Sequence, residues 1–284
     1  TLKRITQVAS VIGHNFGYRL LQTITGMGEE LKSCLDKLQS IELIYEKKLF
    51  PELEYTFKHA LIQEVAYSSL LIKRRKELHV KIGLALEFLN TDRLDEFYEI
   101  LAYHFSVGEE YSKALQYLKL SGKKAESNFS HLEAFHFFEK TLRTFDKLPK
   151  EEGADAEKLE IYDLIRRPIA MLGYPKDSLR ILTEGVEIAK ALGDQKSLSR
   201  FHNDISLLYT ARGESLLSIA HSEKSFHEAA KIEDIEIMAP LALPLCYAYL
   251  TSCKYGELIY VSSKVAELIE RLGRETDSFN TPFR

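Results

Sequence analysis

Gly173-Tyr-Pro-Lys-Asp-Ser178 and Gly213-Glu-Ser-Leu-Leu-Ser218 are two turn-forming stretches that lie 40 residues apart. The same offset relates Ala191-Leu-Gly-Asp194 to Lys231-Ile-Glu-Asp234 and then to Arg271-Leu-Gly-Arg274. Between these landmarks the apolar residues have helical spacing, and no strand pattern occurs after about residue 73. Self-similarity at a fixed period is typical of helical repeat proteins. We therefore predict three helical hairpins with a period of about 40 between residues 156 and 274.

Small residues early in two upstream helices extend this pattern. Ala114 and Ala134 each follow a turn, and large residues, Leu118 and Phe138, follow them four positions later. Because a single hairpin cannot bury its apolar face alone, stacked hairpins form a continuous core with a concave surface. The pattern indicates degenerate repeats of the tetratricopeptide kind and predicts an α-solenoid. An ordinary helical bundle is the alternative.

The first 72 residues have a different pattern, in which helical and strand-like stretches are mixed. Helical spacing covers residues 2–12, 16–24 and 31–38, and two short stretches rich in β-branched and aromatic residues follow at 41–46 and 54–58, separated by a turn at Pro51. A further helix covers 60–70. Three helices and a β-hairpin predict a winged helix. We expect a mostly α chain with a winged-helix domain at 1–72, linking helices and degenerate repeats at 73–148, and three hairpins at 149–284, reached through a connection at 149–155.

Composition excludes several classes of protein. The chain has 284 residues, is 45% hydrophobic and has a net charge of −4; a dedicated nucleic-acid binder is far more basic. No apolar run is long enough to cross a membrane. An odd count of three cysteines without a CxxC pair indicates free thiols, so we expect a cytoplasmic protein. Because the first residue is Thr1 and no signal peptide follows, we interpret the chain as a piece of a longer protein.

Motifs for catalysis are missing from the sequence. There is no P-loop, no HExxH and no Gly-x-Ser-x-Gly. His131 and His136 are five residues apart and do not share a helix face, so we expect no metal site. The basic run Lys73-Arg-Arg-Lys76 is typical of a solvated helix face, with an acidic partner as the alternative. We therefore expect no catalytic residue and no cofactor in this chain.

The stretch Tyr55-Thr-Phe-Lys-His-Ala-Leu-Ile-Gln-Glu-Val-Ala-Tyr-Ser-Ser-Leu-Leu71, with the basic run and Leu78-His79 after it, closely resembles the winged-helix segment of bacterial STAND-type signalling ATPases. Leu2 to Gly13 is similar to the helix that opens that segment. In this family a nucleotidyl cyclase or another effector domain precedes an ATPase module and a tetratricopeptide array. The resemblance is specific over about residues 1–85 and loose over the repeats.

The resemblance implies one site residue. His59 matches a histidine that contacts the phosphates of ADP in the resting state of such ATPases, and a helix N-terminus beside Lys58 favours a phosphate. Packing against the hairpin or capping the helix is the alternative role for His59. ATP or ADP and Mg²⁺ are expected only in an ATPase domain outside this chain.

Three functions remain to be compared. The first is a non-catalytic sensor, in which the concave face of the repeats binds a protein or small ligand and the winged helix relays that event to an upstream ATPase domain. The second is a transcription regulator; the third predicted helix starts with Glu29-Glu30, which repels phosphate, so we do not expect DNA binding. The third is an enzyme with a site in the helical groove. Aromatic side chains proposed to contact the partner of the repeats are Tyr162, Phe201, Tyr209, Tyr247 and Tyr249.

Overall fold

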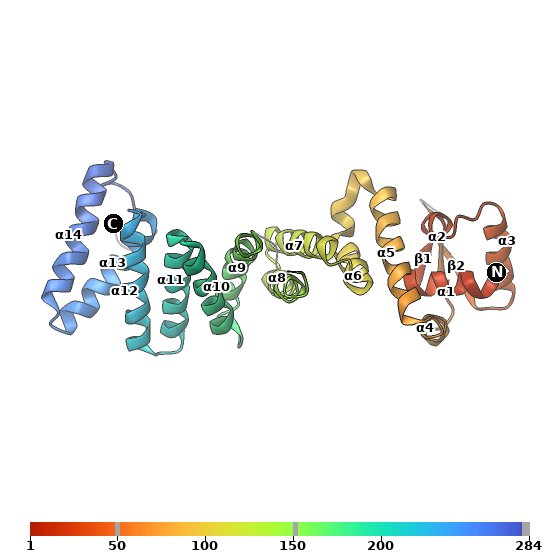
Figure 1. The fold of residues 1–284 in the computed structure, drawn as a ribbon, viewed down its shortest axis with the longest axis horizontal. Coiled ribbons are helices and arrows are strands. Elements are labelled where there is room, and N and C mark those ends of the chain that lie inside the picture. Colours follow the sequence, from red (N-terminus) through yellow and green to blue (C-terminus); the bar gives the residue numbers. More distant parts are fainter. Residues whose placement is uncertain (49–51, 150–152, 280–284) are drawn as a thin grey trace. The chain divides into compact units, whose positions relative to one another are not determined.

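The computed structural model describes residues 1–48, 52–149 and 153–279. The chain divides into two compact units. Unit 1 comprises Thr1–Gly122 and Arg143–Pro149, and unit 2 comprises Lys123–Leu142 and Lys150–Arg284. Most of the described residues are helical, and a small sheet lies in unit 1 (Figure 1). The mostly helical fold is thus confirmed, whereas the predicted turn at Pro51 and residues 150–152 of the predicted connection lie outside the described residues.

Unit 1 begins with helices that enclose a three-stranded antiparallel sheet of order β1-β3-β2. Buried apolar residues at helical spacing, such as Ile5, Leu21, Leu31 and Leu35, form the core between these helices. The elements are α1 (Leu2–Ile12), β1 (Asn15–Gly17), α2 (Tyr18–Thr25), α3 (Glu30–Ser40), β2 (Ile44–Lys48), β3 (Glu54–Phe57), α4 (Ala60–Ser68), α5 (Ile72–Leu89), the 3₁₀ helix η1 (Thr91–Phe97) and α6 (Tyr98–Gly108).

Strand β1 is a correction to the sequence prediction, which assigned Phe16 to a helix. Phe16 lies opposite Tyr55 in the β1–β3 pair, and its buried ring stacks on that tyrosine with a centroid distance of 5.9 Å. The ring of Phe57 lies on the same side of β3 as that of Tyr55, and its centroid is 5.5 Å from the centroid of Phe16. The sequence did not reveal β1, because three residues are too few to show the alternating pattern of a strand. The predicted hairpin of β2 and β3 is confirmed.

The helices of unit 2 follow one another at regular intervals. A residue with left-handed backbone lies in each of the five turns that connect α9 to α14 and directly after α14. These residues are 20 positions apart, so successive hairpins repeat every 40: Gly173, Gly193, Gly213, Glu233, Cys253 and Gly273. Helices α7 (Tyr111–Ser127) and α8 (His131–Phe145) contribute residues to both units. The hairpins pair α9 (Ala154–Met171) with α10 (Ser178–Leu192), α11 (Gln195–Ala211) with α12 (Ser215–Lys231), and α13 (Ile235–Thr251) with α14 (Tyr255–Leu272), as Figure 1 shows.

Small residues bring neighbouring helices of unit 2 close together. A Cβ atom on Gly185 of α10 would lie 2.7 Å from the ring of Phe201 in α11, so only glycine fits there. Between α11 and α12 the buried hydroxyl of Ser199 donates to the Ser225 carbonyl at 2.7 Å, and that of Ser225 donates back to the Ser199 carbonyl at 2.9 Å. Helices α10, α11 and α12 are therefore in close contact, and a hydrophobic cluster that starts at Phe226 of α12 continues into α13 and α14.

Candidate functional site

Helix α4 of unit 1 is apolar but leaves its side chains at the surface. None of its residues is buried, and the side chains of Leu61 and Val65 are 67% and 61% exposed. Leu71 and Ile72, directly after it, are also exposed. Soluble proteins rarely expose several large apolar residues together unless another surface covers them. The sequence indicates this exposure, because α4 is apolar on more than one side. The helical spacing by itself showed only that Leu61 and Val65 belong to a helix.

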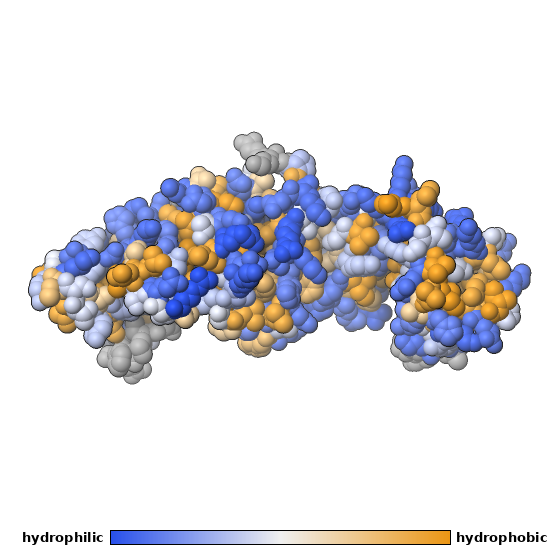
Figure 2. Space-filling view, turned by 90° about the horizontal axis from the view of Figure 1, so that it is seen from below, coloured by the Kyte–Doolittle hydropathy of each residue, from blue (hydrophilic) through white to orange (hydrophobic). Residues whose placement is uncertain are grey.

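An apolar groove of about 230 Å³ lies beside α4, between the start of α1 and the end of α3. Figure 2 shows hydrophobic side chains gathered on the part of unit 1 where these elements lie. The exposed Ile41 forms one wall of the groove. The lining residues are Leu2, Lys3, Thr6, Gln7, Leu38, Ile41, Leu43, Ala66 and Ser69. Ala66 of α4 lines the groove, and we call the groove together with the exposed side chains of α4 the α4 surface.

His59 lies at the edge of the α4 surface. It is the N-terminal cap of α4, its side chain is exposed, and its ring makes no capping hydrogen bond. The neighbouring Lys58 is paired with Glu42, so part of the positive charge expected beside His59 is neutralised. The imidazole is therefore accessible to a group outside unit 1, and its contact with a nucleotide stays a prediction.

The basic run at the start of α5 is mostly engaged within unit 1. The guanidinium of Arg75 donates to the carbonyls of Ser68 and Leu70, both at 2.9 Å, and lies over the ring of Tyr67. Arg74 pairs with Glu77 within α5, and Lys76 pairs with Glu109. Arg75 thus holds the C-terminal end of α4, and these three cations do not form a free basic patch.

The aromatic residues proposed for the repeats occupy different places. Tyr162, Phe201 and Tyr249 are buried, because they face neighbouring helices. The hydroxyl of Tyr162 donates to Glu184 at 2.7 Å, and that of Tyr249 donates to Glu223 at 2.9 Å. The rings of Tyr162 and Phe201 thus lie in the core of unit 2, and their proposed contact with a partner stays a prediction.

The other proposed aromatic residues are more accessible. Tyr209 is half-buried beside His221, with the ring centroids 5.6 Å apart. Tyr247 is 69% exposed. Tyr249, although buried, borders a groove of about 580 Å³ between α12 and α14. A partner-binding role for Tyr209, Tyr247 and Tyr249 stays a prediction.

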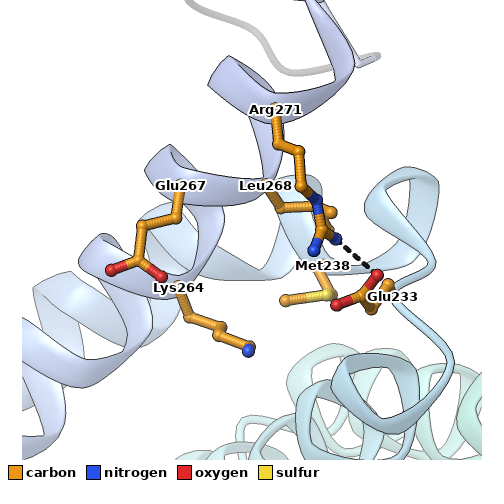
Figure 3. Close-up of a pocket in the computed structure, with 6 residues that line it drawn as sticks. All are labelled: Glu233, Met238, Lys264, Glu267, Leu268 and Arg271. Atoms are coloured by element: carbon orange, nitrogen blue, oxygen red, sulfur yellow. Dashed lines mark hydrogen bonds and ion pairs between the residues drawn. The ribbon is translucent and has the colours of Figure 1, made fainter.

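Two further grooves of unit 2 occupy equivalent positions in successive hairpins. One, of about 500 Å³, is lined by Leu198, Lys224 and Lys231, among others. The other, of about 150 Å³, is lined by Met238, Lys264 and Arg271, which lie 40 positions after those three residues. Figure 3 shows Arg271 reaching from α14 to Glu233, with which it is paired, above Met238. Each groove mixes lysines with glutamates, so neither offers a concentrated charge to a ligand.

A buried ion network joins the first two hairpins. Arg166 of α9 donates to Asp204 of α11 and, at 2.9 Å, to Asp163. Arg200 of α11 lies 3.7 Å from the same Asp163. The positions 40 residues after Arg200 and Asp204 are prolines in α13, so the network does not recur. Because each charge has an opposite charge beside it, the network fixes α9 against α11 rather than presenting a ligand site.

In the part of the chain that the structure describes, no group of three or more His, Cys, Asp or Glu side chains could hold a metal ion. Cys34, Cys246 and Cys253 are free thiols. No described helix is long and apolar enough to cross a membrane.

Comparison with known proteins finds few relatives. No family model matches the chain. An uncharacterised protein of Rhizobium meliloti is 25% identical over an alignment of 201 residues, and the match covers 67% of this chain. The chain spans only 19% of the length of that protein.

Three solved structures match much of the chain at low TM-scores. RapI in its apo form matches 89% of this chain and 62% of its own, with a TM-score of 0.48 and 11% identity. BtubC from P. vanneervenii matches 93% and 95%, with a TM-score of 0.48 and 10% identity. A STAND protein with a tetratricopeptide repeat sensor from Pyrococcus horikoshii matches 96% and 45%, with a TM-score of 0.38 and 15% identity. Because the sequence identities and TM-scores are this low, we assign no activity of these proteins to this chain.

Proposed function

We propose that this chain is a non-catalytic regulatory region of a multidomain signalling ATPase. Residues 1–72 form a winged helix that relays a signal, and the helical hairpins bind a protein or small ligand. An upstream ATPase domain of the same polypeptide, with ATP or ADP and Mg²⁺, receives the signal and controls an effector such as a nucleotidyl cyclase. We place this protein in the bacterial cytoplasm.

The architecture supports the two parts of this proposal. The order α1-β1-α2-α3-β2-β3 with its antiparallel sheet supports the proposed winged helix. The hairpins of unit 2 repeat every 40 residues, and arrays of this kind present extended binding surfaces. The sequence contains no P-loop, HExxH or Gly-x-Ser-x-Gly motif, as we expect for a region that receives and transmits a signal.

The α4 surface is the observation that carries the proposal. It combines exposed Leu61 and Val65 with an apolar groove and with the unengaged ring of His59. An apolar surface of this kind gains stability when a second domain covers it, at roughly 25 cal/mol per Å² of apolar area removed from water. A neighbouring ATPase domain that covers it in the resting state leaves His59 at the boundary, where a bound ADP phosphate is within the reach of an imidazole.

DNA binding is less well supported. In a winged helix the third helix enters the major groove. Here α3 starts at Glu30, directly after Glu29, and both side chains are exposed beside Lys32. The acidic start repels the phosphate backbone, so we do not propose a DNA-binding function.

Hydrogen exchange in the parent protein tests the proposal. We expect the amides of α4 and of the first turn of α1 to exchange at least tenfold more slowly in the parent with ADP than in this chain alone. Helix α14, which is far along the array, serves as the internal control. Equal exchange of the α4 amides in both proteins would contradict the proposed contact between α4 and the ATPase domain.

A further inference from the structure

The groove between α12 and α14 in unit 2 has a volume of about 580 Å³, which is in the range of small-molecule pockets. Its floor is apolar, because the buried side chains of Phe226, Leu245 and Val261 line it. Two tyrosines complete the lining, Tyr249 from α13 and Tyr260 from α14. A floor of this kind favours the apolar body of a small molecule.

Two carboxylates that line the groove have no ion-pair partner among the described residues. The half-buried Glu223 accepts a hydrogen bond from the Tyr249 hydroxyl at 2.9 Å. Burial raises the pKa of Tyr249, and the carboxylates of Glu223 and Glu257 raise it further, so both lie near that hydroxyl. A half-buried carboxylate loses hydration without gaining a counter-ion, and a bound cation therefore stabilises it.

The other charged residues of α12 in the groove lie at its boundary. Lys224 and Glu228 also line the neighbouring groove over α11, so the two grooves share them. Glu228 is paired with Lys231 at 2.7 Å. His227 is exposed at the rim. The end of the groove beside Tyr249 thus keeps the negative charge of its two carboxylates.

Lys254 indicates where this end of the groove holds a cation. Its Nζ lies 5.8 Å from the centre of the Tyr249 ring. An ammonium in that position is attracted by the negative face of the ring. Lys254 is exposed at the N-terminal cap of α14 and makes no capping hydrogen bond, so its side chain is free to give way to a ligand cation.

The equivalent place in the preceding hairpin lacks this combination. Forty positions earlier Tyr209 stands for Tyr249, but Thr183 stands for Glu223. Glu257 likewise corresponds to the apolar Leu217. The two carboxylates therefore distinguish this groove from its equivalent and are not part of the repeat pattern.

We infer that the groove between α12 and α14 binds a small organic amine, with its apolar body on the floor and its ammonium beside Glu223, Glu257 and the Tyr249 ring. The charge of the two carboxylates and the apolar floor together select this class of ligand. That the amine is the signal read by this region rests on the proposed function, whereas the binding itself belongs to this chain and is tested on it alone.

Calorimetric titration of the full chain at pH 7.5 with three probes of one skeleton tests the inference. Phenylbutylamine carries the ammonium, phenylbutanol is uncharged, and phenylbutyrate is an anion. We expect the amine to bind about tenfold more tightly than the alcohol, because hydrogen bonds to charged groups are the stronger ones. The butyrate should bind most weakly. A capped Ala-Lys-Ala tripeptide, which carries an ammonium on a peptide, should bind more weakly than the amine.

Variants assign the effect to the groove. Glu223→Gln keeps an acceptor for Tyr249 but removes the charge, and Glu257→Gln removes the second charge. Each should weaken binding of the amine about tenfold and leave that of the alcohol unchanged. Lys254→Met removes the competing ammonium and should strengthen binding of the amine about threefold. Glu267→Gln changes an exposed carboxylate of α14 outside this groove and should match the wild type.

The inference is overturned if the amine shows no saturable binding, or if the butyrate binds as tightly as the amine. It is also overturned if the tripeptide binds more tightly than the amine, or if the two glutamine variants keep the full affinity. Far-UV circular dichroism verifies that each variant is folded. A failure of the parent-protein experiment on domain contact would leave these outcomes unchanged, so the two proposals fail separately.

Discussion

Helix α4 of unit 1 and helix α11 of unit 2 contrast in what covers their apolar residues. Helix α11 lies between α10 and α12, and it buries Phe201 and Leu208 completely. Helix α4 buries no side chain, although it contains Leu61, Ile62 and Val65. Both units expose some large apolar side chains, such as Leu216 in unit 2, but α11 has a buried side and α4 has no buried residue. The lack of a buried side makes α4 the helix whose contacts the following variants test.

Truncation of matched apolar residues in the two helices should give the largest difference. Phe201→Ala removes a fully buried ring between α10 and α11, and we expect a loss of about 3–5 kcal/mol in the free energy of unfolding. Leu61→Ala removes an exposed side chain and should change it by less than about 0.5 kcal/mol. Denaturant titration followed by circular dichroism measures both. Similar losses for the two variants would show that α4 is covered.

Acid should weaken unit 1 more than unit 2. His79 has a lowered pKa of about 4, so the unfolded chain binds more protons than the folded chain between pH 6.5 and pH 4. The stability of unit 1 is therefore fully present above pH 6.5 and falls as the pH decreases, by about 2–3 kcal/mol for this residue.

The pair His202 and His221 in unit 2 is the internal comparison. These rings are only half-buried, with Nδ1 atoms 3.3 Å apart, and burial lowers the pKa of His202 to about 4. Because unit 1 also holds His104, whose pKa burial lowers further, to about 3, we expect a smaller loss of stability in unit 2. Thermal unfolding at pH 7.5 and pH 5.0, with hydrogen exchange to separate the units, measures the difference. A larger acid effect in unit 2 would reverse the comparison.

Glycines at two helix positions should respond in opposite directions. Gly185→Ala places a methyl group against the ring of Phe201, where the backbone of α10 approaches α11, and should destabilise unit 2 by about 1–2 kcal/mol. Gly256→Ala in α14 meets open space and should stabilise that helix by about 0.5–1 kcal/mol. Thermal melts of the two variants provide the test. A stabilising Gly185→Ala would mean that α10 and α11 are not in close contact.

The smallest effect concerns the turns of the array. Cys253 has a φ of 56° at the position where the two preceding hairpins have Gly173 and Gly213. Glycine adopts this backbone without strain, so Cys253→Gly should stabilise unit 2 by roughly 0.5–1 kcal/mol. Gly213→Ala, the reverse change in the preceding hairpin, should destabilise it by a similar amount. Calorimetry resolves such shifts, and a neutral Cys253→Gly would mean that the turn differs from its equivalents.

The sequence predicted the regular part of the molecule better than the irregular part. Landmarks such as Gly173 and Gly213 recur because the same turn recurs, so the helices of unit 2 could be placed from one sequence. Glu233 and Cys253 have the same left-handed backbone without glycine, and only the period reveals them. Strand β1 was missed because its three residues carry no period.

The candidate sites depend on tertiary contacts that a pattern does not contain. Helical spacing marks Leu61 and Val65 as apolar, but it cannot tell whether another element covers them. His79 lies near Leu78 and Ile82 on the buried side of α5, which is a signal for a buried polar residue. Its partner His104 is 25 residues away, and only the packing of α5 on α6 brings the two rings together.

The central claim is that the α4 surface is the contact through which this region controls the parent protein. The most direct test is the ligand-free effector output of the parent with Leu61→Ser and Val65→Ser together. The matched control is Leu216→Ser with Ile259→Ser, two apolar positions of the array that are at least 61% exposed, as Leu61 and Val65 are. We expect a several-fold rise in basal output for the α4 variant and none for the control. Basal output unchanged by the α4 variant, in a protein that folds normally, would contradict the claim.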